Sequence, residues 1–559
     1  MAKMNGSQYL AETLDAYGVS HVFFVPAVLM EALAKMEKTG VRRIMAHAEK
    51  SAAYMADGYA RVSGRPGVCM AQNIGGSNLA AGLRDARMAG SPVIAISGGP
   101  SPAGRFRGYY QEIEDFPQFD AVTKFNAVVE DPTRLPDLLR QCFREATTGT
   151  PGPVHLQFQG VTGEVIECTA EMEAGIQPAF RAAPAFRPQP PAGQVEAALK
   201  RLRAAKRPVI VAGGGVAWSG AQAQVVELAE RLDIPVATSL NAKGTILDTH
   251  RLSLGVVGVY SRDCANKAVA EADLVVFIGS RTGSQVTNNW RTPARSTPVV
   301  HIDIEPREIG RNYLDTVPVH GDARAVIERM LEALPATPKR PGAWSRRTAS
   351  LVAEWRERET PLLSSDARPI RPERLCSAIS SVLPEGGIVV SDTGHSGMWS
   401  STMIDFTRPG QRYIRCAGSL GWSLPAAMGI KCAAPDRAVV CFNGDGAIYY
   451  HIGELETAAR HDIPVVVVVN NNAAFNQEVH LVEAGYGGRM TKKAAELWEL
   501  RDVDFASVAE SFGCAGLRVT DPADLEPTIR EAIALGRPVV VDVKTDVEAM
   551  ARHAWAPPS

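Results

Sequence analysis

The sequence predicts an α/β protein made of three doubly wound parallel-sheet domains, and three observations carry this prediction. Apolar runs such as Val439–Phe442 and Pro464–Val469 stop at Gly or Asn, as is typical of strands buried on both faces. Between these two runs, apolar residues from Ile452 to Ala459 recur at helical spacing. The chain has 559 residues, which is enough for three or four domains of ordinary size.

The N-terminal part of the chain alternates short strands and helices, which is the α/β pattern. Its expected strands include Gly18–Val25, Gly67–Gln72 and Pro92–Ser97, and Glu49–Val62 is an expected amphipathic helix. Shifts in composition divide the rest, because stretches rich in Pro, Ala and charge are typical of linkers. The expected divisions are 1–163 (first domain), 164–193 (linker), 194–334 (central domain), 335–372 (linker), 373–547 (third domain) and 548–559 (C-terminal tail).

Composition excludes several classes of function. The formal net charge of −2 argues against nucleic-acid binding as the main activity. The nine cysteines are scattered without a Cys-x-x-Cys pair, which favours neither a zinc site nor a disulfide framework. No signal-peptide pattern or bilayer-length apolar run is present. We therefore expect a cytoplasmic protein that binds neither nucleic acid nor membrane.

Two polar residues follow the apolar runs named above. A right-handed strand–helix–strand crossover would place Asp445 and Asn472 at the same edge of a parallel sheet, where ligands bind. A carboxylate and an amide oxygen suit Mg²⁺, and Gly444 and Gly446 would let the backbone approach a diphosphate. A capping Asp and a turn-forming Asn are common after any strand. Their joint placement favours a metal–diphosphate site.

This segment resembles a known motif. Gly444-Asp445-Gly446, closed by Asn471-Asn472, resembles the thiamine diphosphate (ThDP) motif. From about Gly6 to about Val543 the chain resembles the acetolactate synthase-like superfamily, which includes oxalyl-CoA decarboxylase and 2-hydroxyacyl-CoA lyase. The resemblance implies a pyrimidine-binding first domain, a nucleotide-binding-like central domain and a diphosphate-binding third domain. It implies ThDP and Mg²⁺ as cofactors, with Asp445, Asn472 and the Ala474 carbonyl as metal ligands.

The resemblance also implies residues around the cofactor. Glu49 lies in EKSAAYMADGYAR, which resembles the signature of the catalytic glutamate that activates the aminopyrimidine ring, although the helix dipole also favours an acid in a first turn. Gly418 would offer its carbonyl to the 4′-amino group, and Leu420, otherwise a core leucine, would support the bent cofactor. Asn78 would line the pyrimidine pocket, or else cap a helix. The remaining cofactor-binding candidates are Gly394, His395, Ser396, Gly444, Gly446, Ala447, Asn472 and Phe475.

Two neighbouring residues occupy the family's substrate-proximal position. Gln111 would hydrogen-bond an intermediate, and Tyr110 would donate a proton. A satisfied loop amide and a half-buried tyrosine are equally open alternatives.

In relatives the central domain binds FAD, ADP or nothing. Arg281 resembles the arginine that meets a nucleotide diphosphate, and Asp303 would hold a ribose or adenine edge, unless it merely ends a strand. Thr282–Gln285 lacks the Asp-Asp-Arg that acetolactate synthases usually carry there. ADP is therefore expected before FAD.

Three functions remain open. The first is a carbon–carbon lyase or synthase acting on 2-hydroxyacyl-CoA, favoured by the missing flavin residues and by the apolar segment Ala27–Met30. The second is an acetolactate synthase or another 2-oxo acid decarboxylase or carboligase. The third is a non-catalytic relative. The resemblance implies a cofactor held between two chains, and hence a homodimer or a dimer of dimers acting on a small-molecule substrate.

Overall fold

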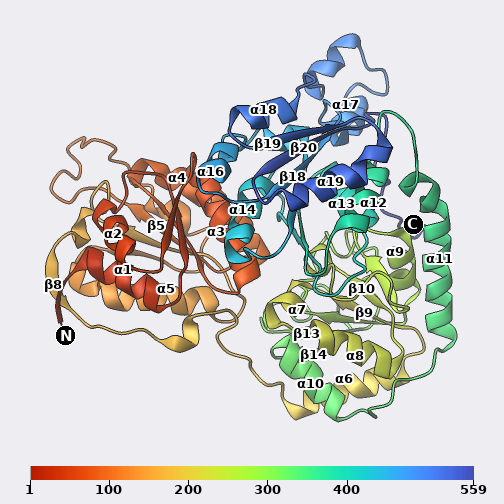
Figure 1. Ribbon diagram of the computed structural model, residues 1–559. Coiled ribbons are helices and arrows are strands. Elements are labelled where there is room, and N and C mark those ends of the chain that lie inside the picture. Colours follow the sequence, from red (N-terminus) through yellow and green to blue (C-terminus); the bar gives the residue numbers. More distant parts are fainter. Residues whose placement is uncertain (1, 559) are drawn as a thin grey trace.

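The computed structural model describes residues 2–558 and divides into three domains, each built on a six-stranded parallel sheet (Figure 1). Helices flank every sheet, so the predicted fold class is confirmed. Most strands are fully buried because they carry continuous Val, Ile, Phe and Ala runs, as expected for sheets covered on both faces.

The N-terminal domain holds the first sheet. Its strands, in spatial order, are β3 (Arg42–Met45), β2 (His21–Phe24), β4 (Gly67–Ala71), β5 (Val93–Gly98), β7 (Val154–Phe158) and β6 (Asn126–Val129). Its helices are α1 (Gly6–Ala16), α2 (Met30–Lys35), α3 (Glu49–Ser63), α4 (Gly76–Ala89) and α5 (Leu135–Thr147). The segment 164–193, expected to be a linker, carries β8 (Thr169–Met172), which pairs antiparallel with β1 (Ala2–Asn5).

The central domain has a different strand order. Its strands, in spatial order, are β11 (Ser253–Val256), β10 (Val236–Thr238), β9 (Pro208–Ala212), β12 (Leu274–Ile278), β13 (Val299–Asp303) and β14 (Thr316–His320). Its helices are α6 (Ala192–Ala204), α7 (Gly214–Ser219), α8 (Gln222–Leu232), α9 (Asp263–Glu271) and α10 (Ala323–Glu332). Counted within the domain, this is the 3-2-1-4-5-6 order of dinucleotide-binding folds, with its switch point between β9 and β12.

The C-terminal domain repeats the strand order of the N-terminal one. Its strands, in spatial order, are β16 (Arg412–Arg415), β15 (Ile388–Ser391), β17 (Val439–Gly444), β18 (Val466–Asn471), β20 (Val539–Lys544) and β19 (Ala515–Val519). Its helices are α12 (Pro372–Val382), α13 (His395–Met403), α14 (Ser423–Ala433), α15 (Asp445–Ile448), α16 (Glu454–Arg460), α17 (Val479–Gly485), α18 (Phe505–Ser511) and α19 (Leu525–Ala534). Counted within each domain, both sheets have the order 2-1-3-4-6-5.

Helix α3 of the N-terminal domain packs on α14 of the C-terminal domain, and glycines allow the two backbones to approach closely. A Cβ atom on Gly58 would overlap the carbonyl oxygen of Ala426. A Cβ atom on Gly429 would overlap the carbonyl oxygen of Met55. This crossing fixes the N-terminal domain against the C-terminal one.

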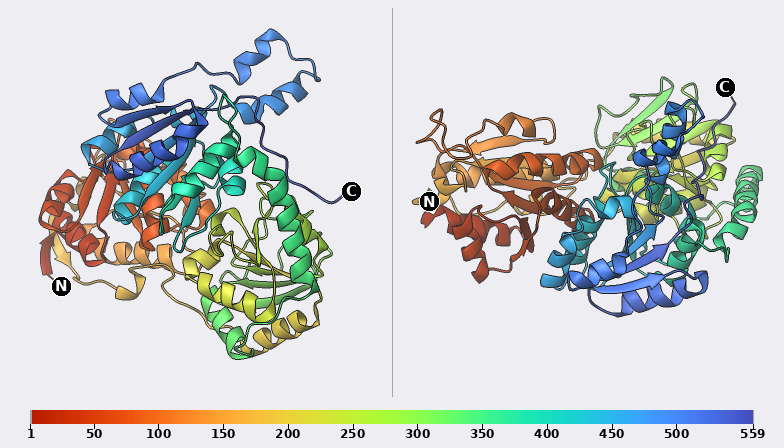
Figure 2. Two further views of the ribbon diagram at one scale, coloured as in Figure 1. Left: turned by 45° about the vertical axis from the view of Figure 1, so that its right-hand side comes forward. Right: turned by 90° about the horizontal axis from the view of Figure 1, so that it is seen from above.

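Two further segments join the central and C-terminal domains. The long helix α11 (Ala343–Leu363) runs along the outside of the molecule and packs on α9 and α12 (Figures 1 and 2). The C-terminal tail lies on the central domain, where the Nδ2 groups of Asn266 and Asn288 donate to the Trp555 carbonyl at 2.8 and 3.2 Å. The tail is therefore fixed to the central domain.

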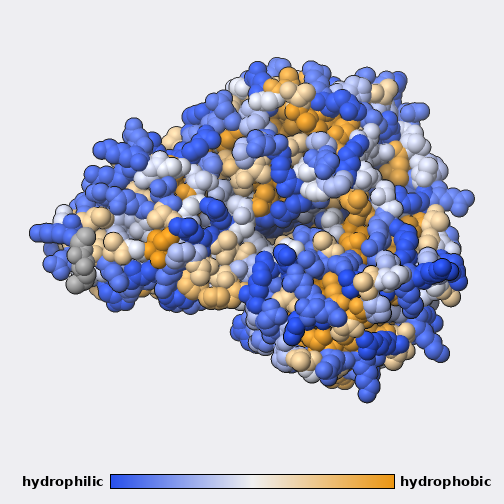
Figure 3. All heavy atoms as spheres, turned by 60° about the horizontal axis from the view of Figure 1, so that its bottom comes forward, coloured by the Kyte–Doolittle hydropathy of each residue, from blue (hydrophilic) through white to orange (hydrophobic). Residues whose placement is uncertain are grey.

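Hydrophilic residues predominate on the face shown in Figure 3, where apolar ones form separate patches. Within residues 2–558, no helix combines the length and the apolar character needed to span a bilayer.

Candidate active site

A cavity of about 240 Å³ opens at the carboxyl edge of the C-terminal sheet. Its walls come from the loops that follow β15, β16, β17 and β18. Eleven residues singled out from the sequence line it together: Gly394, His395, Ser396, Leu420, Gly444, Asp445, Gly446, Ala447, Asn472, Ala474 and Phe475.

Asp445 sits where β17 ends and α15 begins, and it is 4% exposed. The backbone N–H of Gly446 donates to its Oδ1 at 2.8 Å, and the N–H of Ala474 donates to its Oδ2 at 3.1 Å. Burial raises the pKa of the Asp445 carboxyl to about 6, and these hydrogen bonds oppose that rise. A cation beside this group would favour its ionised form.

The cavity floor has no room for additional side chains. A Cβ atom on Gly446 would overlap the ring of Phe475, and one on Gly444 would lie 3.0 Å from Ser396 Oγ. Gly394 has a left-handed φ of +70°, which favours glycine. Backbone atoms therefore form much of the cavity surface, and a diphosphate could approach them closely.

Several polar atoms of the cavity are buried without a hydrogen-bond partner in the part of the chain described, among them Asn470 Oδ1 and Gln477 Oε1. An unpaired buried polar atom costs about 1–3 kcal/mol, so a polar ligand or water is expected here. Residues 2–558 contain no group of three or more His, Cys, Asp or Glu side chains able to hold a metal. A cation would thus need amide, carbonyl and ligand oxygens beside Asp445, which matches the preferences of Mg²⁺.

Glu49 and Asn78, both predicted from the sequence, lie in contact. Glu49 is the first residue of α3, and Asn78 Nδ2 donates to its Oε2 at 3.1 Å. A Cβ atom on Gly75 would lie 2.7 Å from Glu49 Oε1, so glycine leaves space for the carboxylate. Helix α4 begins at Gly76 with Gly75 as its N-cap, so Asn78 is not the capping residue.

Within one chain, the walls of the Asp445 cavity come only from residues 393–478. Glu49, Asn78, Tyr110 and Gln111 therefore lie outside it, as does Gly418.

The loop that carries Tyr110 and Gln111 has an unusual backbone. Tyr110 is 76% exposed and is not the half-buried tyrosine considered as an alternative. Gln111 has a left-handed φ of +60°, and its carbonyl accepts from Asn73 Nδ2 at 2.5 Å. Its Oε1 is buried without a partner among the described residues, so the side-chain amide is not satisfied within the chain.

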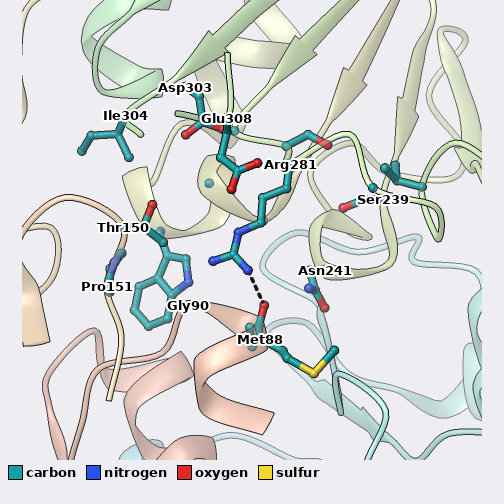
Figure 4. Close-up of a pocket in the computed structure, with 18 of the residues that line it drawn as sticks. Met88, Gly90, Thr150, Pro151, Ser239, Asn241, Arg281, Asp303, Ile304 and Glu308 are labelled. Atoms are coloured by element: carbon teal, nitrogen blue, oxygen red, sulfur yellow. Dashed lines mark hydrogen bonds between the residues drawn. The ribbon is translucent and has the colours of Figure 1, made fainter. Parts of the chain in front are cut away.

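A second cavity, of about 280 Å³, lies at the switch point of the central sheet and is also lined by residues of the two other domains (Figure 4). Arg281 and Asp303 both line it. Arg281 Nη1 donates to the Met88 carbonyl at 2.9 Å, so this residue joins the central and N-terminal domains. Burial raises the pKa of Asp303 to about 6. Arg281 and Asp303, both predicted from the sequence to contact a nucleotide, therefore line the same cavity.

Comparison with known proteins identifies the family. Models of three thiamine pyrophosphate enzyme domains match the chain: the N-terminal TPP binding domain at residues 4–119, the central domain at 195–330 and the C-terminal TPP binding domain at 392–543. A probable acetolactate synthase large subunit of Methanocaldococcus jannaschii is 33% identical, over 97% of this chain and 92% of its own length. The acetolactate synthase isozyme 3 large subunit of Escherichia coli is 31% identical, over 98% and 96%.

The chain belongs to the acetolactate synthase-like thiamine diphosphate enzymes. The resemblance drawn from the sequence is thereby confirmed, as are the three α/β domains it implied.

Two buried acids of this ThDP-type fold, Asp85 and Asp392, were not among the residues predicted from the sequence. The N–H groups of Ala417 and Ser419, on either side of Gly418, donate to the Asp85 carboxylate at 2.8 and 3.1 Å. The N–H groups of Gly421 and Ser423 donate to Asp392 at 3.0 and 2.9 Å. Together the two acids fix the loop that holds Gly418 and Leu420. Asp392 directly follows the buried strand β15, and this position could have identified it from the sequence.

Proposed function

We propose that this protein is a ThDP- and Mg²⁺-dependent enzyme that decarboxylates a 2-oxo acid and joins the resulting fragment to a second carbonyl compound. The observation that carries the proposal is the buried Asp445 carboxylate, held by two backbone N–H groups beside Asn472 and Ala474. The likeness to acetolactate synthases over nearly the whole chain supports the 2-oxo acid as substrate.

Each group has a role in this proposal. Asp445, Asn472 and the Ala474 carbonyl hold Mg²⁺, and Gly394, His395 and Ser396 face the diphosphate. Burial lowers the pKa of His395 to about 4, so its imidazole is neutral near pH 7 and can donate one hydrogen bond to a phosphate oxygen. Glu49, oriented by Asn78, would exchange a proton with the aminopyrimidine ring. When bound, ThDP supplies the nucleophilic carbon and the electron sink.

The names of the relatives favour the second of the three functions left open by the sequence. The relatives above are named acetolactate synthase large subunits, and their names give no support for a 2-hydroxyacyl-CoA substrate. We therefore place the 2-oxo acid reaction ahead of acyl-CoA cleavage.

We also infer that the central cavity binds an adenine nucleotide, ADP rather than FAD. The 3-2-1-4-5-6 strand order supports a nucleotide, as do Arg281 and Asp303 at the carboxyl edge. The absence of Asp-Asp-Arg at Thr282–Gln285 argues against the flavin. Stoichiometric FAD released from the denatured protein would overturn this inference.

The reaction itself gives the main test. Purified protein is loaded with ThDP and Mg²⁺ and incubated with pyruvate and a series of other 2-oxo acids. We expect CO₂ release and a 2-hydroxy-3-oxo acid as the ligation product, detectable by NMR, with Asp445→Asn as the inactive control. Cleavage of 2-hydroxyacyl-CoA without any turnover of 2-oxo acids would overturn the proposal in favour of the acyl-CoA reaction.

A further inference from the structure

A third cavity, of about 520 Å³, adjoins the central one between the N-terminal and central domains. Its walls come from the end of α4, the segment after α5 and the loops after β12 and β13. Five residues line both this cavity and the central one: Met88, Gly149, Thr150, Arg281 and Glu308. A molecule in one cavity can therefore extend toward the other.

The walls of this third cavity are rich in cations. Arg87, Lys124, Arg281 and Arg307 all line it. The N-terminal domain provides the first two and the central domain the last two, so charge of one sign gathers where the domains meet.

The two acids of the cavity are already paired. Glu305 accepts from Arg307 Nε at 2.8 Å. Glu308 accepts from Arg311 at 3.0 Å. Neither acid forms an ion pair with Arg87 or Arg281, although the charge of Glu305 acts on Arg87 and Lys124 from a distance.

The cationic side chains differ in how many N–H groups remain free to bind a ligand. Lys124 Nζ donates to the carbonyls of Glu145, Thr148 and Thr150 at 2.6, 2.7 and 2.9 Å, which uses all three of its N–H groups. Lys124 therefore contributes charge but no further hydrogen bond.

Arg281 donates one N–H group to the Met88 carbonyl, as Figure 4 shows. No hydrogen bond or ion pair joins Arg87 to another residue within 2–558, so its whole guanidinium is available. Partial burial lowers the pKa of Arg87, and repulsion from Arg281 and Arg307 lowers it further, while attraction to Glu305 opposes this shift. An arginine nonetheless stays protonated, so an anion placed between these groups would relieve the repulsion.

We propose that this third cavity binds a phosphate group, held by Arg87 and Arg281 with Lys124 adding its charge. A guanidinium fork presents paired N–H groups that match phosphate oxygens. The phosphate is either free inorganic phosphate or the terminal phosphate of a nucleotide whose base lies near Asp303. Only the second source rests on the proposed function, because it requires the nucleotide in the central cavity.

The test uses the full-length protein after its nucleotides have been removed. Inorganic phosphate and ADP are titrated separately by calorimetry at low ionic strength, into wild type and into Arg87→Gln. Arg84→Gln is the matched control, since Arg84 is exposed on the same helix, one turn earlier, and lines neither cavity. Arg87→Gln is expected to weaken binding at least about 10-fold, while Arg84→Gln leaves it within about 2-fold of wild type.

The two sources give different results. Loss of inorganic phosphate binding in Arg87→Gln identifies a site for free phosphate, whereas weakening of ADP alone identifies the nucleotide's own phosphate. The proposal is overturned if wild type binds neither ligand, or if Arg87→Gln binds both as wild type does. The variant should unfold at no lower temperature than wild type without ligand, because it removes a repulsion. Carboligation is assayed in parallel, so failure of the proposed function is seen separately from failure of phosphate binding.

Discussion

At the scale of single residues, the contact between Glu49 and Asn78 orients the carboxylate that we propose to be catalytic. The amide donor fixes the orientation of the carboxylate, and Gly75 leaves the space beside it. Helix α3 begins at Glu49 itself, so the residue is positioned by the end of β3 and the first turn of the helix.

Replacing Glu49 by Gln tests its role directly. The amide keeps the size of the side chain but cannot take part in proton exchange, so turnover should fall by about 10²–10⁴-fold. ThDP affinity should stay within a few-fold of wild type, as measured by fluorescence titration. Near-normal turnover would remove Glu49 from the proposed role.

At the residue scale, the sequence allowed placement of residues that directly follow a strand. Asp445 and Asn472 directly follow the buried strands β17 and β18, and their convergence could be inferred from the order of parallel strands alone, whereas His395 lies four residues beyond the end of β15. Asp85 was out of reach, because its hydrogen bond to Ala417 joins positions 332 residues apart. Arg87 was not singled out for the same reason, since Arg281, the arginine beside it in the third cavity, comes from another domain.

At the scale of elements, strand positions followed closely from apolar runs. The expected strands Gly67–Gln72 and Pro92–Ser97 correspond to β4 (Gly67–Ala71) and β5 (Val93–Gly98), within one residue at each end. The crossover after β17 differs, because it contains two short helices, α15 and α16, instead of one. The two helices are separated by residues 449–453, which include Gly453, the N-cap of α16. The spacing of apolar residues alone does not reveal such an interruption.

The crossing of α3 and α14 offers a test of an interface between elements. Gly429→Ala places a methyl group against the Met55 carbonyl, and overpacking of this kind costs about 1–3 kcal/mol. The melting temperature should fall clearly in calorimetry. Gly485→Ala is the control, since nothing lies within 4 Å of its added Cβ and it should melt like wild type. Equal melting of both variants would show that the two helices can separate at little cost.

At the scale of the whole molecule, the Asp445 cavity lacks a wall from the N-terminal domain of its own chain. If a second copy provides Glu49, the inactive variants Glu49→Gln and Asp445→Asn should restore activity when unfolded and refolded together. Hybrid dimers then hold one intact site each, and a random mixture should regain about a quarter of wild-type activity. No recovery in a mixture shown to contain hybrids would mean that each chain completes its own site.

Acid should destabilise the protein through buried histidines. Burial lowers the pKa of His155 to about 3, so below its unfolded value of 6.5 the unfolded chain binds the proton and the folded one does not. Stability is therefore lost as pH falls from about 6.5 toward 3, by about 2 kcal/mol at pH 5 for this residue. Urea unfolding at pH 7 and pH 5 should show a smaller loss for His155→Gln than for wild type. An identical loss would place the acid sensitivity elsewhere.

The close approach of α3 and α14 also bears on the internal symmetry of the chain. Each helix follows the second strand of its own sheet, the two sheets share one strand order, and the contacts are reciprocal, Gly58 against Ala426 and Gly429 against Met55. Such mutual contacts are the mark of an isologous association, in which one patch meets its own copy across a twofold axis. The single polypeptide thus carries an internal pseudo-dyad, as if two identical ancestral subunits had been fused and had then diverged.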